Sequence, residues 1–272
     1  ELDKVISRID KAFEFCQNAN NDFNDNELDS MKLSLMVIKS IRDKITTTEL
    51  DEITSQICMN LRLENPDWGI LGSRIIISNH QKNTNWSFLK AMEKLYNNVD
   101  DVGNKSPLLN EEFMEIINEY STEIHDMIKS DRDFLIDYFG FKTLERAYLL
   151  KTSDGVIQET PQYMFMRVSI GIHGRNLEQV KNTYDMMSLK FGTHATPTLF
   201  NAGTQRNHLA SCFLLGTHDS VDKIYETVRD CAKISKYAGG IGIHISNIRC
   251  KGSYIKGTGG KATGILPMLK VF

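Results

Sequence analysis

Residues 205–245 constrain the fold of this chain most strongly. Two short apolar runs, residues 209–215 and 240–245, flank an amphipathic stretch over residues 220–236. The two runs have the length of strands, whereas the apolar residues between them recur at helical spacing. A strand, a helix and a second strand at this spacing predict a parallel crossover unit of an α/β sheet or barrel. An α/β domain is therefore predicted to begin near residue 205.

The residues before this unit follow helical periodicity. Apolar side chains such as Val5, Ile9 and Phe13 recur at helical spacing through about residue 82. Thr46 precedes acidic residues as a helix cap does, and Thr143 is a second predicted helix start. We predict a mainly α-helical region before the α/β domain. Its simplest interpretation over residues 2–82 is a small helical bundle that binds no ligand.

The composition excludes several classes of protein. The 272 residues are 41% hydrophobic and 25% charged, which allows two domains, and the net charge of −3 gives no general attraction to nucleic acid or to a membrane surface. The sequence contains neither an apolar run of spanning length nor a secretory signal. The five cysteines have neither disulfide-scaffold nor zinc-ligand spacing. We expect a cytoplasmic protein that binds no metal, nucleic acid or membrane.

Cys212 is the candidate for thiol chemistry. It follows Ser211 at the junction between a polar turn and an apolar run. In α/β folds, strand ends that face a cleft carry the chemistry, and a thiol there can act as nucleophile or redox partner. The alternative is a small buried side chain, which is the usual state of a free cysteine. Cys16, Cys58 and Cys231 lie on apolar helical faces and are predicted to be core residues.

A glycine-rich segment over residues 249–260 carries several cations, beginning with Arg249. It has neither P-loop nor dinucleotide-binding spacing. Ala262 stands where a P-loop needs serine or threonine, and where the dinucleotide-binding pattern needs its last glycine. The segment is predicted to wrap a triphosphate with its amides and cations, or to be a solvated surface loop. Asp219 before the helix can cap it or accept a hydrogen bond from a ribose hydroxyl.

Several segments together carry a family resemblance that covers the chain in order. They are residues 131–134, 138–146, 167–168, 193–204, 211–215, 235–236 and 238–242. In these segments the chain resembles the large subunit of class I ribonucleoside-diphosphate reductases from eukaryotes and large viruses. That family reduces ribonucleoside diphosphates to deoxyribonucleoside diphosphates for DNA synthesis, by a thiyl-radical mechanism under nucleotide allosteric control.

The resemblance implies three regions. Residues 1–85 correspond to an ATP-cone, residues 86–204 to a helical domain, and residues 205–272 to the first strands of a ten-stranded α/β barrel. It also implies that Cys212 is one of two cysteines that supply electrons and are re-reduced through thioredoxin or glutaredoxin. The substrate would contact Ala195, Thr196, Ser211, Gly239 and Gly240.

Two effector sites follow from the same resemblance. A specificity site for dNTP or ATP at a homodimer interface corresponds to Asp219, Ser220, Ile224 and Arg249, with Lys236 contributed across the interface. An activity site for ATP or dATP corresponds to Asp3, Lys4, Thr47, Asp51 and Lys82. The effectors carry Mg²⁺, and higher oligomers are compatible with the family. No cofactor is bound covalently.

The resemblance also implies what the chain needs from elsewhere. A small subunit with a metal cofactor supplies the radical. In the family, the radical-bearing cysteine and the partner of Cys212 lie beyond the position of Phe272, so we expect an N-terminal portion that is inactive alone. Two other interpretations stay open: a cobalamin-dependent reductase with the same barrel, and a non-catalytic nucleotide-binding regulator.

Overall fold

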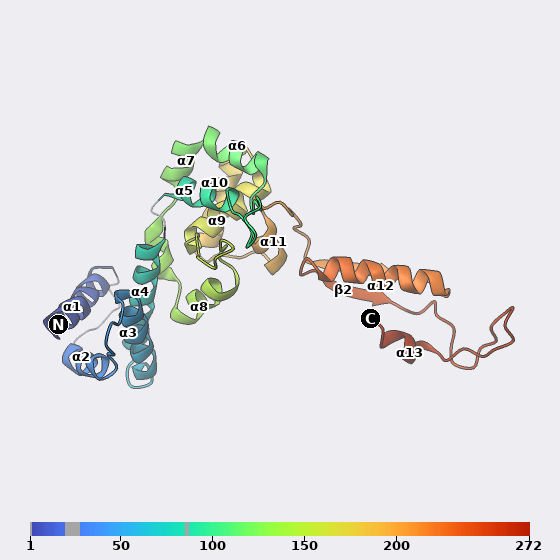
Figure 1. Ribbon diagram of the computed structural model, residues 1–272, viewed down its shortest axis with the longest axis horizontal. Helices are drawn as coiled ribbons and strands as arrows, with labels where there is room; N and C mark the ends of the chain where they lie inside the picture. Colours follow the sequence, from blue (N-terminus) through green and yellow to red (C-terminus); the bar gives the residue numbers. More distant parts are fainter. Residues whose placement is uncertain (1, 20–27, 85–86) are drawn as a thin grey trace. The chain divides into compact units, whose positions relative to one another are not determined.

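The computed structural model of the chain describes residues 2–19, 28–84 and 87–272, which divide into two compact units (Figure 1). Unit 1 contains residues 1–193 and 203–205, and unit 2 contains residues 194–202 and 206–272. Among the described residues, no helix combines the length and the apolar character that crossing a bilayer requires.

Unit 1 is helical. Its elements are α1 (Leu2–Ala19), α2 (Ser30–Lys39), α3 (Thr47–Leu61), α4 (Asp67–Asn83), α5 (Phe88–Tyr96), α6 (Glu111–Glu119), α7 (Ser121–Met127), the 3₁₀ helix η2 (Ser130–Leu135), α8 (Tyr138–Ala147), α9 (Pro161–His173) and α10 (Leu177–Ser188). Unit 2 contains α11 (Thr196–Asn201), β1 (Cys212–Gly216), α12 (Val221–Ser235), β2 (Gly240–His244) and α13 (Ile265–Leu269).

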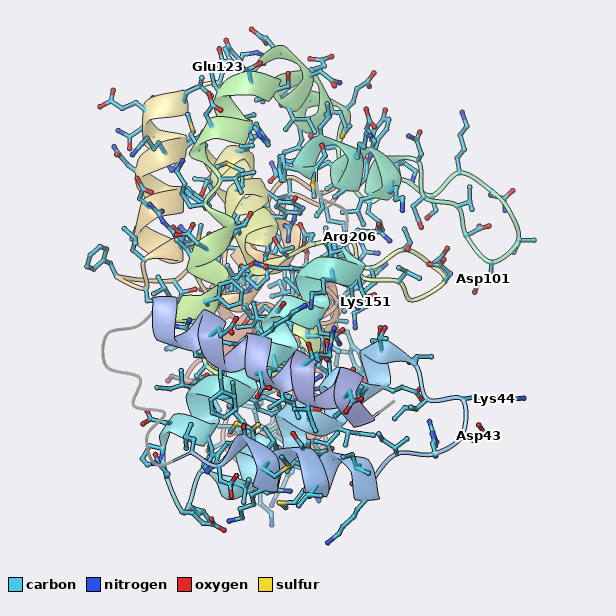
Figure 2. The ribbon with its side chains drawn as sticks, turned by 90° about the vertical axis from the view of Figure 1, so that its left-hand side faces the viewer. Asp43, Lys44, Asp101, Glu123, Lys151 and Arg206 are labelled. Atoms are coloured by element: carbon cyan, nitrogen blue, oxygen red, sulfur yellow. The ribbon has the colours of Figure 1, made fainter. Side chains whose placement is uncertain are left out.

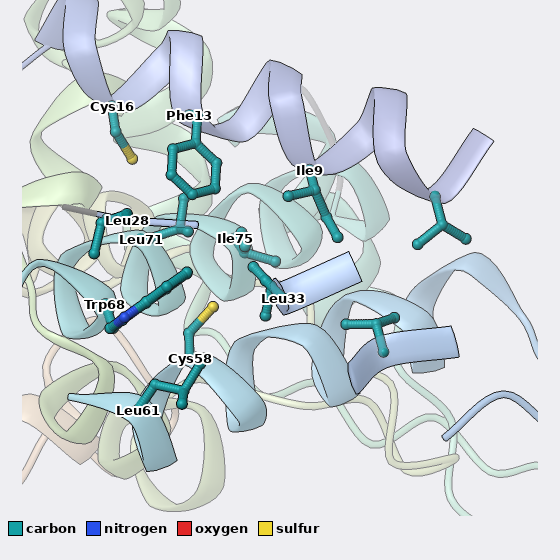
Figure 3. Close-up of a cluster of buried hydrophobic side chains, with 12 residues drawn as sticks. Ile9, Phe13, Cys16, Leu28, Leu33, Cys58, Leu61, Trp68, Leu71 and Ile75 are labelled. Atoms are coloured by element: carbon teal, nitrogen blue, oxygen red, sulfur yellow. The ribbon is translucent and has the colours of Figure 1, made fainter. Parts of the chain in front are cut away.

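Helices α1 to α4 share one apolar core. Figure 3 shows Phe13 of α1 and Trp68 of α4 facing each other between the helices, and their rings meet edge to face with centroids 6.1 Å apart. Cys16 and Cys58 are fully buried in the same cluster. Burial raises the pKa of both thiols, that of Cys16 to about 12, so they stay protonated and serve as core residues, as predicted.

The start of α3 agrees with the sequence. Thr46 Oγ1 accepts a hydrogen bond from Glu49 N at 3.1 Å, and Glu49 Oε2 accepts one from Thr46 N at 2.9 Å, so the capping box is complete. The preceding loop turns at Lys44, which has a positive φ of 61°. Figure 2 shows Asp43 and Lys44 of this loop directed away from the helices.

The predicted helix start at Thr143 is wrong. Helix α8 already begins at Tyr138, because Asp137 Oδ1 accepts a hydrogen bond from Gly140 N at 2.7 Å and caps it. Thr143 lies inside the helix, where its hydroxyl donates to Phe139 O at 2.8 Å. Within a helix, threonine can satisfy its hydroxyl in this way, so a threonine before an acidic residue does not by itself mark a terminus.

Helix α9 forms the centre of the remaining helices of unit 1. Every residue from Pro161 to Ile170 is buried, and Thr160 caps the helix ahead of Pro161. The core includes a buried ion pair, in which Arg167 Nε donates to Glu159 Oε1 at 2.6 Å and neither side chain is exposed. It also includes Asp133, which accepts hydrogen bonds from Gln81 Nε2 and Gln162 N.

The predicted crossover unit forms in unit 2. Strands β1 and β2 are parallel neighbours, paired in register from Cys212 opposite Gly240 to Gly216 opposite His244. Helix α12 connects them and packs on one face of the pair, the face of Phe213 and Ile241. The prediction of a mainly helical region followed by parallel α/β structure is confirmed, with two strands in the described part of the sheet.

Candidate functional site

Cys212 stands at the beginning of β1 with its side chain exposed. Of the two interpretations of the sequence, this exposure contradicts a small buried side chain and favours an accessible thiol. Ser211 Oγ lies 3.6 Å from Cys212 Sγ, within the range of a weak hydrogen bond to sulfur. Ser211 O accepts from Gly240 N at 2.7 Å, which holds the start of β2 beside the cysteine.

Gly239 and Gly240 bring the backbone close to Cys212 for two different reasons. A Cβ on Gly239 would lie 2.6 Å from Ile234 Cγ2 and 2.8 Å from Phe213 Cε2, so packing under α12 requires glycine there. A Cβ on Gly240 would meet only Ser211 O, at 3.4 Å, so this position lies open beside the thiol. The sequence predicted both glycines near a ligand, but packing accounts for Gly239.

Ala195 and Thr196 form the N-terminal end of α11 in the same unit, Ala195 as the cap and Thr196 as the first helical residue. Two hydrogen bonds attach this helix to the segment that leads into β1. Thr198 Oγ1 donates to Leu209 O and Asn201 Nδ2 donates to His208 O, each at 2.9 Å. The sequence did not predict a helix here, because six residues are too few to show a period.

A second group of predicted residues lines one cavity of about 440 Å³ in unit 2. Asp219, Ser220, Ile224 and Arg249 all border it. Arg249 Nε donates to Asp219 Oδ2 at 2.6 Å, a contact that joins residues 30 positions apart. Ser220 caps α12 by accepting from Lys223 N, so the cap is Ser220 while Asp219 stays available for Arg249.

The lining of this cavity is mainly apolar. Sequence reasoning missed Val221 and Tyr225, although their spacing from Ile224 on α12 places all three on neighbouring positions of one helical face. Lys261 adds a second cation. Lys236 is absent from this lining and lies at the C-terminal cap of α12, with its ammonium 5.8 Å from the centre of the Tyr237 ring.

A separate cavity of about 250 Å³ lies in unit 1, bordered by α1, α3 and α4. Of the predicted activity-site residues, Asp51 and Lys82 line it. Asp51 is 3% exposed and makes a two-pronged ion pair with Arg8. Desolvation, followed by the charge of Arg8, lowers the pKa of Lys82. Arg8, Lys11 and Arg74 complete a cationic lining that contains one acidic side chain, Asp51.

Two of the other predicted activity-site residues, Asp3 and Thr47, do not line this cavity. Asp3 is exposed in the first turn of α1, and Thr47 is exposed at the first position of α3. The side chain of Lys4 falls outside the described part of the chain. Sequence reasoning missed Arg8, although Asp51, an acidic residue within the apolar face of α3, required a cationic partner.

Comparison with known proteins matches segments of both units to domains of one protein family. Residues 134–207 match the all-alpha domain of ribonucleotide reductase, and residues 210–272 match its barrel domain. Ribonucleoside-diphosphate reductase large subunits from Variola virus and Danio rerio are 45% and 44% identical over 273 and 272 residues. These alignments cover 100% and 99% of this chain. The chain belongs to the ribonucleotide reductase large-subunit family.

The predicted substrate-site residues come from both matched segments, whereas the predicted effector residues all come from one. Ala195 and Thr196 fall in the all-alpha segment, whereas Cys212, Asp219 and Arg249 fall in the barrel segment. Large chain 2 from Saccharomyces cerevisiae is 42% identical over 274 residues. The chain spans about a third of the length of these relatives, 34% for the Variola protein and 31% for the yeast protein.

Proposed function

We propose that this chain is part of the large subunit of a ribonucleoside-diphosphate reductase, which converts ribonucleoside diphosphates to deoxyribonucleoside diphosphates. The observation that carries the proposal is the exposed thiol of Cys212 beside the open backbone at Gly240. A ribose can approach this backbone closely because no Cβ stands in the way. The matched relatives are named for the same activity.

In this proposal Cys212 is one of the two thiols that are oxidised to a disulfide as the ribose is reduced. Ser211 supports the thiol, and the backbone at Gly239 and Gly240 faces the ribose. Ala195 and Thr196 bind the diphosphate from α11. Thioredoxin or glutaredoxin restores the thiols, and the radical that starts the reaction comes from a small subunit with a metal cofactor.

The cavity of unit 2 is proposed to bind a dNTP or ATP effector with Mg²⁺. Its apolar side, Ile224 and Tyr225, suits the face of a base, and Asp219 can accept from a ribose hydroxyl. Arg249 and Lys261 supply positive charge for the phosphates. Lys236, at the far end of α12, is proposed to act on the effector of a partner subunit in a homodimer.

The cavity of unit 1 is proposed to bind ATP or dATP. Four basic side chains line it, those of Arg8, Lys11, Arg74 and Lys82, and they suit a polyphosphate. The single carboxylate, that of Asp51, can accept a hydrogen bond from a ribose hydroxyl. Asp3, Lys4 and Thr47 are proposed to complete the site from the starts of α1 and α3. The proposed regions remain residues 1–85 for the cone, 86–204 for the helical domain and 205–272 for the first part of the barrel.

The test uses a reductase large subunit that contains this sequence, assayed with a small subunit and thioredoxin. Cys212→Ser should abolish formation of deoxynucleotide from CDP, because an alcohol cannot form the disulfide. Cys250→Ser is the matched control, since Cys250 is also exposed and lies outside the proposed substrate site. Retained turnover in Cys212→Ser would contradict the proposal.

The effector sites are tested by equilibrium binding. Asp219→Ala should weaken dTTP binding by roughly 10-fold or more, because it removes a charged partner of the ligand and releases Arg249. Asp51→Asn should weaken dATP binding without changing that of dTTP. If Asp219→Ala instead weakened only dATP binding, the two assignments would have to be exchanged.

A further inference from the structure

The strand pair of unit 2 has one open face. Alternation along the strands places Cys212, Leu214 and Gly216 of β1 on the face opposite α12, and their partners in the parallel register are Gly240, Gly242 and His244. All six positions are exposed, and Leu214 is 91% exposed. The proposed electron-supplying thiol therefore shares a surface with His244, a residue that belongs to none of the sites proposed above.

The surface between Cys212 and His244 consists of glycine backbone and one apolar side chain. Its β2 side consists of Gly240 and Gly242, so bare backbone forms the floor. The Leu214 side chain leans over this floor, since a Cβ on Gly242 would lie 2.9 Å from Leu214 Cδ2. The backbone at Gly240 stays open, and a planar ring that extends from it can lie against the Leu214 side chain, which suits the face of a nucleobase.

His244 stands at the far end of that floor. It lies four strand residues beyond Gly240, or about 13 Å along the strand from the level of Cys212. Its carbonyl accepts from Thr217 N at 3.2 Å, which fixes the backbone of this strand end. Imidazole offers one donor and one acceptor when neutral, so its ring can hydrogen-bond the edge of a base.

The proposed substrate contacts give the direction of the bound molecule. Ala195 and Thr196 lie on α11, which is attached through Leu209 and His208 to the chain just before β1. The diphosphate would therefore lie beyond the Cys212 end of the strands. With the ribose at Cys212, the base has to extend the other way, across Leu214 toward His244.

We infer that His244 is a specificity-determining residue, which hydrogen-bonds the edge of the substrate's base while Leu214 supports the face of that base. This inference rests on the proposed function, because it takes the substrate to be a nucleoside diphosphate with its ribose at Cys212. The two side chains contact different parts of the base. Leu214 contacts every base alike, whereas His244 distinguishes bases that present different donors and acceptors.

The experiment measures kcat/KM for CDP, UDP, ADP and GDP at a saturating concentration of one effector, in a large subunit that contains this sequence, with its small subunit and thioredoxin. His244→Ala should change the ratio of kcat/KM between an amino-bearing and a keto-bearing base by roughly 3- to 10-fold, mainly through KM. His244→Asn, which keeps a donor and an acceptor, should restore part of the ratio. Leu214→Ala should raise KM for all four substrates by similar factors.

His218→Ala is the matched control, because His218 is also exposed but lies after the end of β1. It should leave all four ratios unchanged. Ratios that stay within twofold in His244→Ala would overturn the inference while leaving the proposed function intact. The inference would also be overturned if His244→Ala lost affinity for the effector and this loss explained the whole change in the kcat/KM ratios. If the unaltered subunit reduces none of the four substrates, the proposed function fails and the inference falls with it.

Discussion

Loss of one partner of the buried pair of Arg167 and Glu159 should be among the most destabilising single changes in unit 1. Both side chains are fully buried, and the guanidinium makes two contacts with the carboxylate, at 2.6 and 3.2 Å. Glu159 Oε2 also accepts from Leu150 N at 2.9 Å. Removal of either partner leaves the other charge in the core, where solvent cannot reach it.

The expected magnitude follows from that burial. Arg167→Met or Glu159→Gln alone should lower the free energy of unfolding by about 3–5 kcal/mol. The double variant removes both charges, and the amide oxygen that replaces the Glu159 carboxylate can still accept from Leu150 N. It should therefore cost less than the sum of the two single changes by about 2 kcal/mol or more.

The assay is urea unfolding followed by tryptophan fluorescence, which reports on unit 1 because Trp68 is buried in its core and residues 194–272 contain no tryptophan. Arg175→Met is the matched control. Arg175 also faces carboxylates, those of Glu115 and Glu119, but it is 46% exposed, so its removal should leave the urea midpoint nearly unchanged. Additive effects of the two single changes would refute this account of the pair.

Three further changes test other parts of unit 1. Burial raises the pKa of Asp133 to about 6 from 3.8, so the folded state keeps a proton that the unfolded chain has already lost. As the pH rises from 3.8 to about 6, the free energy of unfolding of the wild type should therefore fall by up to about 3 kcal/mol relative to that of Asp133→Asn. A difference between the two proteins that does not vary with pH would contradict the raised pKa. Gly203→Ala should cost about 1–3 kcal/mol in urea unfolding, because φ is +77° and the new Cβ would lie 2.9 Å from Phe113 Cδ2. Thr46→Ala should cost about 1 kcal/mol by removing the side-chain half of the capping box, whereas Thr47→Ala, outside the cap, should cost less.

Features that depend on neighbouring residues could be predicted from the sequence. The capping box at Thr46, the helix start at Pro161 and the strand–helix–strand order after residue 205 all follow from short-range patterns, and all are present. Each depends on hydrogen bonds or periodicity within one or two turns, so the local sequence contains the whole signal. The position of Cys212 at the start of a strand belongs to this group.

The incorrect and missed predictions have a different cause. The start of α8 at Tyr138 escaped detection because the pattern at Thr143 looked equally suitable, and only the hydrogen bond from Gly140 to Asp137 distinguishes them. The short helices α7 and α11 extend over too few residues to show a period. In these places several local patterns were compatible with the same residues.

The residues of this chain alone, read as local patterns and as a family resemblance, determined its fold class, its order of elements and the residue types available for nucleotide chemistry. Only the tertiary structure decided which of them meet. It joined Arg8 to Asp51 across 43 positions and Arg249 to Asp219 across 30, and it placed His244 on the face of Cys212. The physical reason is that a charge removed from water needs a partner of opposite sign. The sequence shows that need, but chain topology selects the partner.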